Sequence, residues 1–122
     1  MIAGGTDLLP NLKHELYDVD VLVSLARVPG LNGIARAPDG TLAIGAMTPL
    51  EVVAASDEVR GAAPALAQAV SLVAGPQHRR MGTLGGNVML DTRCRWINQT
   101  YFWRAALGFC LKKDGSLCHV VE

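Results

Sequence analysis

Two short glycine-rich segments constrain the fold of this chain more than any other feature. Residues 3–7 read Ala-Gly-Gly-Thr-Asp, and residues 82–87 read Gly-Thr-Leu-Gly-Gly-Asn. Because glycine has no Cβ, such a segment turns tightly and can bring several backbone amides close to one anion. Thr6 in the first segment, and Thr83 and Asn87 in the second, add side-chain hydrogen-bonding groups. The pair can clamp the two phosphates of one pyrophosphate, and two independent turns are the plain alternative.

The first segment precedes a predicted helix that begins near Asp7. The free amides and the dipole at a helix N-terminus favour phosphate oxygens. Since a carboxylate repels phosphate, we expect Asp7 to cap the helix or to accept a hydrogen bond from a ribose hydroxyl. An ordinary strand-to-helix turn has the same kind of sequence. The segment is neither a dinucleotide fingerprint nor a P-loop, because no lysine follows its glycines at the required spacing.

Between and beyond these segments, the apolar pattern predicts short helices and strands. Residues 48–51 (Thr-Pro-Leu-Glu) form a capping box with proline at the first helical position. Residues 38–40 (Pro-Asp-Gly) indicate the turn of a hairpin, and residues 77–80 indicate a polar, basic loop. Helices are expected at residues 8–12, from residue 49, at 64–73 and at 98–107, and strands at residues 19–23, 34–37, 41–44, 109–111 and 117–121.

Charge and hydropathy exclude several classes of partner. Eleven Lys and Arg balance eleven Asp and Glu over 122 residues, so no long-range field attracts nucleic acid or an anionic membrane. The longest apolar stretches fall short of the roughly 20 residues of a membrane span, and the N-terminus lacks the regions of a secretory signal. We therefore expect a cytoplasmic protein that binds neither nucleic acid nor membrane. Its three cysteines are then free for a metal or for chemistry rather than for disulfides.

Three segments in order resemble the FAD-binding domain of the molybdenum hydroxylases, a family that includes xanthine dehydrogenase and the medium subunit of carbon monoxide dehydrogenase. They are residues 3–10, 44–48 and 82–87, and the resemblance covers essentially the whole chain. It implies an α+β fold of two small α/β subdomains, residues 1–54 and 55–122, the second incomplete at its C-terminus.

The same resemblance implies FAD in an extended pose between the subdomains, with its isoalloxazine near a partner iron–sulfur subunit. The implied flavin contacts are Ala3, Gly4, Gly5, Thr6, Asp7, Thr83, Gly85, Gly86 and Asn87, with Gly45 and Thr48 near the same cleft. No catalytic acid, base or nucleophile is expected, because the cofactor supplies the chemistry.

The C-terminal part has a more specific resemblance. Residues 91–96, 98–104 and 107–115 strongly resemble the β subunits of 4-hydroxybenzoyl-CoA reductases, which carry a [4Fe-4S] cluster in an insertion. This implies an insertion at about residues 91–122, with the fourth ligand just past its end. Thiolates suit iron–sulfur iron, and the nearby aromatic side chains can exclude water. The implied cluster ligands are Cys94, Cys110 and Cys118.

The implied function is an electron-transfer flavoprotein subunit of a complex that reductively dehydroxylates an aromatic acyl-CoA. Its partners are a molybdenum-cofactor subunit, a [2Fe-2S] subunit and an external electron donor such as ferredoxin. Electrons enter through the cluster, pass to FAD and leave through the partner's [2Fe-2S] centres.

Several alternatives remain open. A scattered cysteine is most often a small buried apolar residue, and no Cys-x-x-Cys pair indicates a zinc ribbon. His119 beside Cys118 gives a Cys3His zinc hypothesis, which is opposed because neighbouring residues on a strand point to opposite faces. His78 with residues 79–80 either meets the adenine or phosphate end of a cofactor or is a solvated basic loop. For the chain as a whole, two further alternatives are a generic molybdenum hydroxylase FAD subunit without a cluster and a non-catalytic assembly module that has lost the cofactor.

Overall fold

The computed structural model describes residues 1–121, which divide into two compact units. The first unit contains Met1–Thr6 and Leu22–Leu90, and the second contains Asp7–Val21 and the chain from Asp91 onward. This division does not coincide with the expected subdomains, 1–54 and 55–122, which stay a prediction. None of the helices formed by residues 1–121 is both long and apolar enough to cross a membrane.

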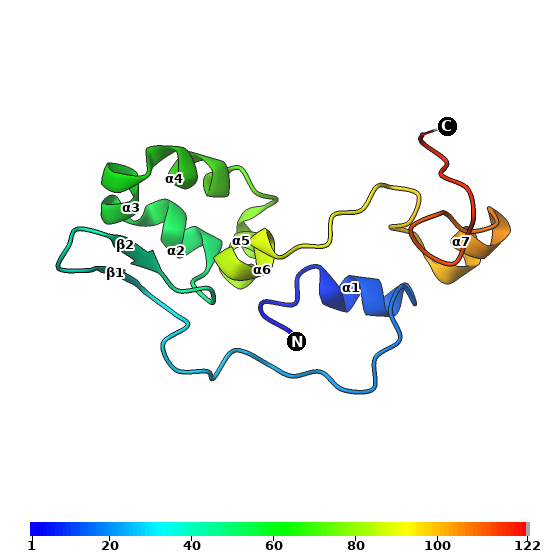
Figure 1. Cartoon of the computed structure of the whole chain (residues 1–122), viewed down its shortest axis with the longest axis horizontal. Coiled ribbons are helices and arrows are strands. Elements are labelled where there is room, and N and C mark those ends of the chain that lie inside the picture. The colour runs from blue at the N-terminus through cyan, green and yellow to red at the C-terminus, as the bar shows by residue number, and fades with distance from the viewer. Residues whose placement is uncertain (122) are drawn as a thin grey trace. The chain divides into compact units, whose positions relative to one another are not determined.

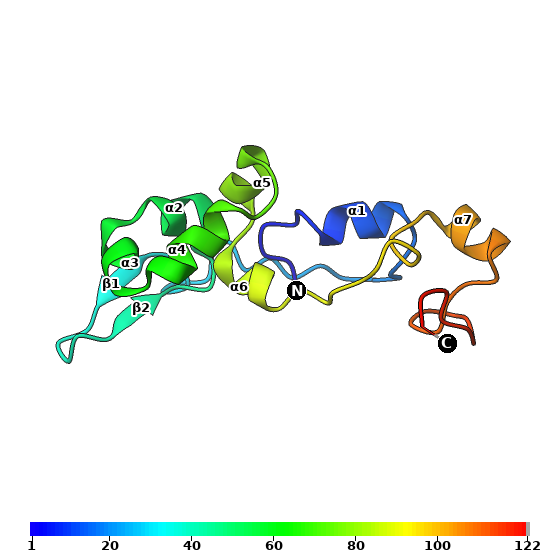
Figure 2. The ribbon, with the colours of Figure 1, turned by 90° about the horizontal axis from the view of Figure 1, so that it is seen from above.

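The core of the first unit is formed by three short helices packed on a two-stranded hairpin, and two further helices follow them along the chain (Figure 1). Helix α2 spans Leu50–Ala55, α3 spans Asp57–Ala62 and α4 spans Pro64–Ser71. Strand β1 (Ile34–Arg36) pairs antiparallel with β2 (Leu42–Ile44), as expected from the turn at residues 38–40. Figure 2 shows the hairpin alongside these helices from a second direction. The core consists of Leu50, Val53, Val59, Ala67 and Val70, with Ile34, Leu42 and Ile44 of the hairpin packed against it.

Helix α2 begins at Leu50, one residue later than predicted, and the capping box does not form. Pro49 occupies the N-cap position, and α2 has no side-chain cap. The Thr48 hydroxyl instead accepts from the Gly33 amide and donates to the Gly33 carbonyl, both at 3.0 Å. The Glu51 carboxylate pairs with Arg80 at 3.0 Å. Both capping groups are therefore taken by partners distant in sequence, which local spacing does not reveal.

The basic loop expected at residues 77–80 is wrong, because these residues belong to helix α5 (Pro76–Met81). Pro76 lies in the first turn, where its missing N–H costs little. Arg79 donates to the carbonyls of Val73 at 3.0 Å and Ala74 at 2.7 Å, in the bend that follows α4. Arg80 pairs with Glu51, so both arginines of this helix have partners within the first unit.

The strands expected at residues 19–23, 109–111 and 117–121 are wrong. Val21 and Val23 are 74% and 55% exposed, and the isolated bridge between Ile2 and Ser24 lies just after this stretch. Residues 109–121 form turns and isolated bridges, and one backbone hydrogen bond, from Leu111 to Leu117 at 2.8 Å, joins the two predicted strands. A run of apolar residues becomes a strand only where a neighbouring strand supplies a ladder of hydrogen bonds.

The second unit holds helices α1 (Leu8–Lys13) and α7 (Tyr101–Ala106) around a small core. Leu16, Ile97 and Cys110 are buried together. The Thr100 hydroxyl accepts from the Trp103 amide and caps α7, so this helix begins three residues later than predicted. The predicted helix at residues 8–12 is confirmed.

Candidate functional site

Residues 3–6 form a tight turn directly after the bridge that Ile2 makes. The Ile2 amide donates to Val23 at 2.8 Å, and the Ile2 carbonyl accepts from Leu25 at 3.0 Å, so the start of the turn is anchored. Gly5 has a φ of 73°, a conformation that strongly favours glycine. Within residues 1–121, the amides of residues 3–6 donate no hydrogen bond. Since residues 3–5 are half-exposed and Thr6 is exposed, these amides are available to an anion.

The second glycine-rich segment is not an open loop but the start of helix α6 (Leu84–Val88). Thr83 is 4% exposed, and its hydroxyl caps the helix by accepting from the Gly86 amide at 3.1 Å. The Leu84 amide donates to Thr48 at 2.9 Å, the Gly85 amide to Ala46 at 2.8 Å and the Asn87 amide to Thr83 at 2.9 Å. The expectation of free amides on both segments is therefore wrong for residues 84–87. The exposed part of this segment is Gly86 and Asn87.

The two segments lie directly against each other within the first unit. A Cβ built on Gly4 would lie 1.8 Å from the carbonyl oxygen of Met81, the residue before the second segment. A Cβ on Gly86 would lie 3.4 Å from that of Ala3, and a Cβ on Gly82 would lie 3.7 Å from the Thr6 hydroxyl. This adjacency is what a shared pyrophosphate site requires.

A third segment, residues 45–48, supports the second from the side. A Cβ on Gly85 would lie 2.7 Å from that of Ala46, and a Cβ on Gly45 would lie 2.4 Å from the Leu31 carbonyl oxygen. Thr48 is fully buried. These close approaches leave no room for a side chain at Gly45 or Gly85. Thr48 fixes the backbone at Gly33 through two hydrogen bonds.

Asp7, the last residue of the first segment, lies in the second unit. It occupies the N-cap position of α1, but its side chain makes no cap hydrogen bond. One carboxylate oxygen accepts from Asn11 Nδ2 at 3.0 Å, and the other is paired with Arg93. The capping role expected for Asp7 is therefore wrong, since both oxygens are engaged by other side chains.

The three cysteines do not form an assembled metal site. Cys94 is exposed, Cys110 is buried in the small core and Cys118 is half-buried, all as free thiols. Among residues 1–121, no three side chains of His, Cys, Asp or Glu lie close enough together to hold a metal ion. His119, the fourth member of the zinc hypothesis, has Nε2 2.6 Å from the Phe109 carbonyl oxygen.

Cys118 has the one distinctive thiol environment. Hydrogen bonds from the backbone amides of Val120 and Val121 hold the pKa of Cys118 below its ordinary value of 9.0. These bonds favour the thiolate, which is the form that binds metals. The environment therefore suits a ligand, although the other two cysteines are not gathered around it.

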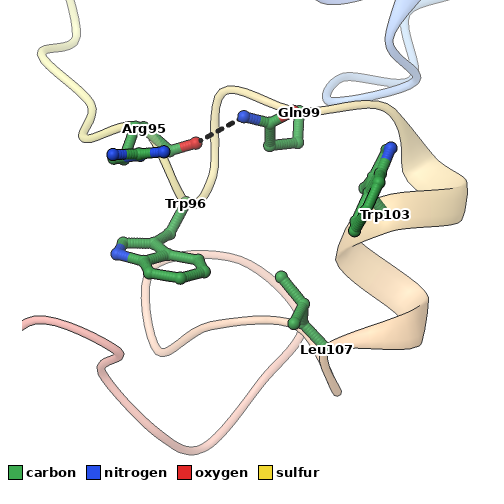
Figure 3. Close-up of a pocket in the computed structure, with 5 residues that line it drawn as sticks. All are labelled: Arg95, Trp96, Gln99, Trp103 and Leu107. Atoms are coloured by element: carbon green, nitrogen blue, oxygen red, sulfur yellow. Dashed lines mark hydrogen bonds between the residues drawn. The ribbon is translucent and has the colours of Figure 1, made fainter.

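Sequence reasoning missed an aromatic hollow in the second unit (Figure 3). Trp96 and Trp103 stand on opposite sides of it with Leu107 between them, and the Arg95 guanidinium lies 5.9 Å from the centre of the Trp96 ring. Gln99 Nε2 donates to the Arg95 carbonyl at 3.1 Å. Trp103 and Leu107 are four residues apart, a spacing that places two side chains on one face of a helix, and this was the sequence signal for the hollow. None of these residues is a predicted flavin contact.

Residues 1–102 match the protein family described as the FAD binding domain in molybdopterin dehydrogenase. The carbon monoxide dehydrogenase medium chain of Hydrogenophaga pseudoflava is 40% identical over 88 residues, which is 72% of this chain and 30% of that protein. The xanthine dehydrogenase FAD-binding subunit of Escherichia coli O157:H7 is 38% identical over 88 residues, with the same two shares.

Solved structures agree with these sequence matches. The carbon monoxide dehydrogenase from Hydrogenophaga pseudoflava superposes with a TM-score of 0.68 at 39% identity, over 71% of this chain and 30% of that chain. Quinoline 2-oxidoreductase from Pseudomonas putida 86 superposes with a TM-score of 0.65 at 36% identity, over 70% of this chain and 30% of that chain.

The chain therefore belongs to the family of FAD-binding domains of molybdopterin dehydrogenases. Its mixed helices and small sheet confirm the expected α+β fold of the molybdenum hydroxylase flavin subunit. The chain spans about 30% of the length of the relatives it matches.

Proposed function

We propose that this chain is part of the FAD-binding subunit of a multi-subunit molybdenum hydroxylase, and that residues 3–6 hold the pyrophosphate of FAD. The observation that supports this most is the set of amides in residues 3–6 that donate to no acceptor within the described chain. Free amides of successive residues in a tight turn make a concave anion site. The exposed Thr6 hydroxyl adds a donor, and no acidic side chain occurs among residues 3–6. The segment therefore fits a diphosphate.

In this proposal the other flavin contacts have two different duties. Thr83 caps the helix of the second segment, and the Gly85 amide ties that segment to the Ala46 carbonyl. Asn87 is exposed and offers an amide side chain to the cofactor. FAD, when bound, supplies the reversible uptake of electrons, and the protein supplies position and electrostatics.

The proposed partners are a molybdenum-cofactor subunit and a [2Fe-2S] subunit, with ferredoxin as an external donor and the cytoplasm as the compartment. Two of the relatives are named as a medium chain and as a subunit of a dehydrogenase complex, which supports a multi-subunit assembly. Co-purification of the complete subunit with molybdenum-containing protein tests this part.

The finer proposal is a 4-hydroxybenzoyl-CoA reductase-like complex with a [4Fe-4S] cluster, and it rests on the resemblance of the segment from residue 91 onward. The family match ends at residue 102, so it covers residues 91–102 of the proposed insertion and leaves out the last twenty residues. Cys94, Cys110 and Cys118 do not fit a cluster as they are placed here, and no electron-transfer step is assigned to it.

Metal analysis of the anaerobically purified protein separates these alternatives. Iron and acid-labile sulfide together with flavin favour the cluster. Flavin without iron leaves the generic FAD subunit, and zinc without iron favours the Cys3His hypothesis.

Replacing the Thr6 hydroxyl tests the pyrophosphate proposal. Thr6→Val keeps the side-chain size and removes a donor, so the Kd for FAD should rise about tenfold, as expected for losing a hydrogen bond to a charged group. Flavin fluorescence titration of the protein that carries this sequence measures it. Thr41→Val, in the exposed turn between β1 and β2, is the matched control and should leave the Kd unchanged. A wild-type protein that binds no FAD would favour the non-catalytic assembly module instead.

A further inference from the structure

The second glycine-rich segment is held on one side by the residues that lead into helix α2. The Leu84 amide donates to the Thr48 carbonyl at 2.9 Å, and the Leu50 amide donates to the Gly82 carbonyl at 2.9 Å. Two hydrogen bonds of opposite direction fix the distance between these stretches, as they do between neighbouring antiparallel strands. The position of the second segment therefore depends on what holds Thr48.

The Thr48 side chain is held by one residue, Gly33. Thr48 is fully buried, and its hydroxyl accepts from the Gly33 amide and donates to the Gly33 carbonyl, both at 3.0 Å. A hydroxyl has one proton to donate, and the Gly33 carbonyl takes it. No part of the Thr48 side chain is left to contact a cofactor, so an effect of this side chain on FAD must be indirect.

Gly33 is itself fixed in the loop before β1. Its φ is 117°, a conformation that favours glycine. Its carbonyl also accepts from the Gly45 amide at 2.8 Å. The Thr48 hydroxyl adds a donor and an acceptor to this backbone pairing, a contact that valine, which has nearly the same shape, cannot make.

The second segment in turn supports residues 3–6. The Met81 carbonyl oxygen occupies the place of a Cβ on Gly4, and the Thr6 hydroxyl lies 3.7 Å from the place of a Cβ on Gly82. A binding site keeps its geometry only while its groups stay within about 0.5 Å of their places. A small movement of the second segment would therefore displace the amides that we assign to the pyrophosphate.

We propose that Thr48 is a positioning residue for FAD: its hydroxyl ties the residues that hold the second segment to Gly33, and so keeps that segment in place against residues 3–6. This inference rests on the proposed function. It makes the affinity for FAD depend on a buried hydroxyl that the cofactor does not touch.

The test compares FAD affinities of variants that keep or remove this hydroxyl, measured by flavin fluorescence titration under conditions in which circular dichroism shows each variant to be folded. Thr48→Val keeps the shape and removes both hydrogen bonds, so the Kd for FAD should rise about tenfold. Thr48→Ser keeps the hydroxyl, and its Kd should stay within about threefold of the wild type.

Val53→Ala is the matched control for a general loss of stability. Val53 is fully buried in the core of the same unit, so its truncation lowers the free energy of unfolding. It makes no contact with the loop at Gly33 through a hydrogen-bonding side chain, and its Kd for FAD should equal that of the wild type.

Thr48→Cys decides the matter if Thr48→Val does not fold, because a thiol is a weaker hydrogen-bonding group than a hydroxyl. Its Kd should then exceed that of Thr48→Ser by about threefold or more.

Two kinds of result overturn this inference and leave the proposed function standing. The first is a wild type that binds FAD together with hydroxyl-free variants of equal affinity. The second is a Thr48→Ser or a Val53→Ala variant as weak as Thr48→Val, since the effect would then come from packing or from stability. A wild type without affinity for FAD removes the proposed function and this inference with it.

Discussion

Gly4 has no room for a side chain, because the Met81 carbonyl oxygen occupies the place where its Cβ would lie. Adding a methyl group there must push the first segment away from the second. We expect Gly4→Ala to lower the free energy of unfolding by about 1–3 kcal/mol, as overpacking does elsewhere. Urea-induced unfolding measures this change.

Gly61 is the matched control for that substitution. It lies inside α3, and nothing lies within 4 Å of a Cβ built on it. Alanine is the better helix former, so Gly61→Ala should stabilise the protein by up to about 1 kcal/mol. Equal effects of the two substitutions would contradict the close approach at Gly4.

Asp91 gives the stability of the second unit a pH dependence whose sign follows from its ion pair. A hydrogen bond from Lys112 Nζ, 2.7 Å long, lowers the pKa of the Asp91 carboxyl below its ordinary value of 3.8. A lowered pKa favours the charged form, so the stability that this pair contributes is present above the unfolded pKa. It is lost as the pH falls through the folded pKa.

Lys112→Gln should therefore raise the pKa of Asp91 toward 3.8 in an NMR titration of the carboxyl carbon. The Asp39 carboxyl is an internal control, because the backbone amide of Thr41 holds the pKa of Asp39 low. Its titration should not move. An Asp91 pKa that is the same in both proteins would contradict the ion pair.

At the scale of elements, the sequence predicted those helices and strands whose formation depends on residues close together in the chain. The hairpin of β1 and β2 forms because a proline, an aspartate and a glycine occupy its turn. Helix α4 begins at a proline, and apolar residues follow it along one face of the helix. Within α4, Ala67 is buried and Ala69 is exposed, and the spacing of small apolar residues alone does not decide which of the two faces the core.

Elements that depend on distant partners could not be predicted in this way. Residues 19–23 have the composition of a strand, but within residues 1–121 the nearest bridge is made by Ser24, just after them. The α7 helix is anchored by Arg104, which is 2% exposed and donates to the Glu15 carbonyl at 2.6 Å. An arginine in a helix is ordinarily exposed, so nothing in the local sequence marks this contact.

The same limit applies to the candidate site. The composition of the two glycine-rich segments and their order predicted a shared site, and the segments do lie in contact. Which amides stay free depends on whether Thr48 and Ala46 present their carbonyls to the second segment. That pairing is tertiary, so the sequence predicted two sets of free amides where the structure leaves one.

At the scale of the whole molecule, residues 1–121 form one buried core in each unit, and Asp7 is the proposed flavin contact that belongs to the second unit. Residues 3–6 and 83–87 belong to the first unit, whose core of five buried aliphatic side chains is the larger one. A site that must hold a cofactor in a fixed geometry is best supported by the better-packed part of a protein. This placement is consistent with a rigid pyrophosphate site at residues 3–6.

The most direct measurement is a crystal structure of the protein that carries this sequence, grown with FAD. The proposed site predicts pyrophosphate oxygens within hydrogen-bonding distance of the backbone amides of Gly4, Gly5 and Thr6. A pyrophosphate bound elsewhere, with those amides facing only solvent, would contradict it.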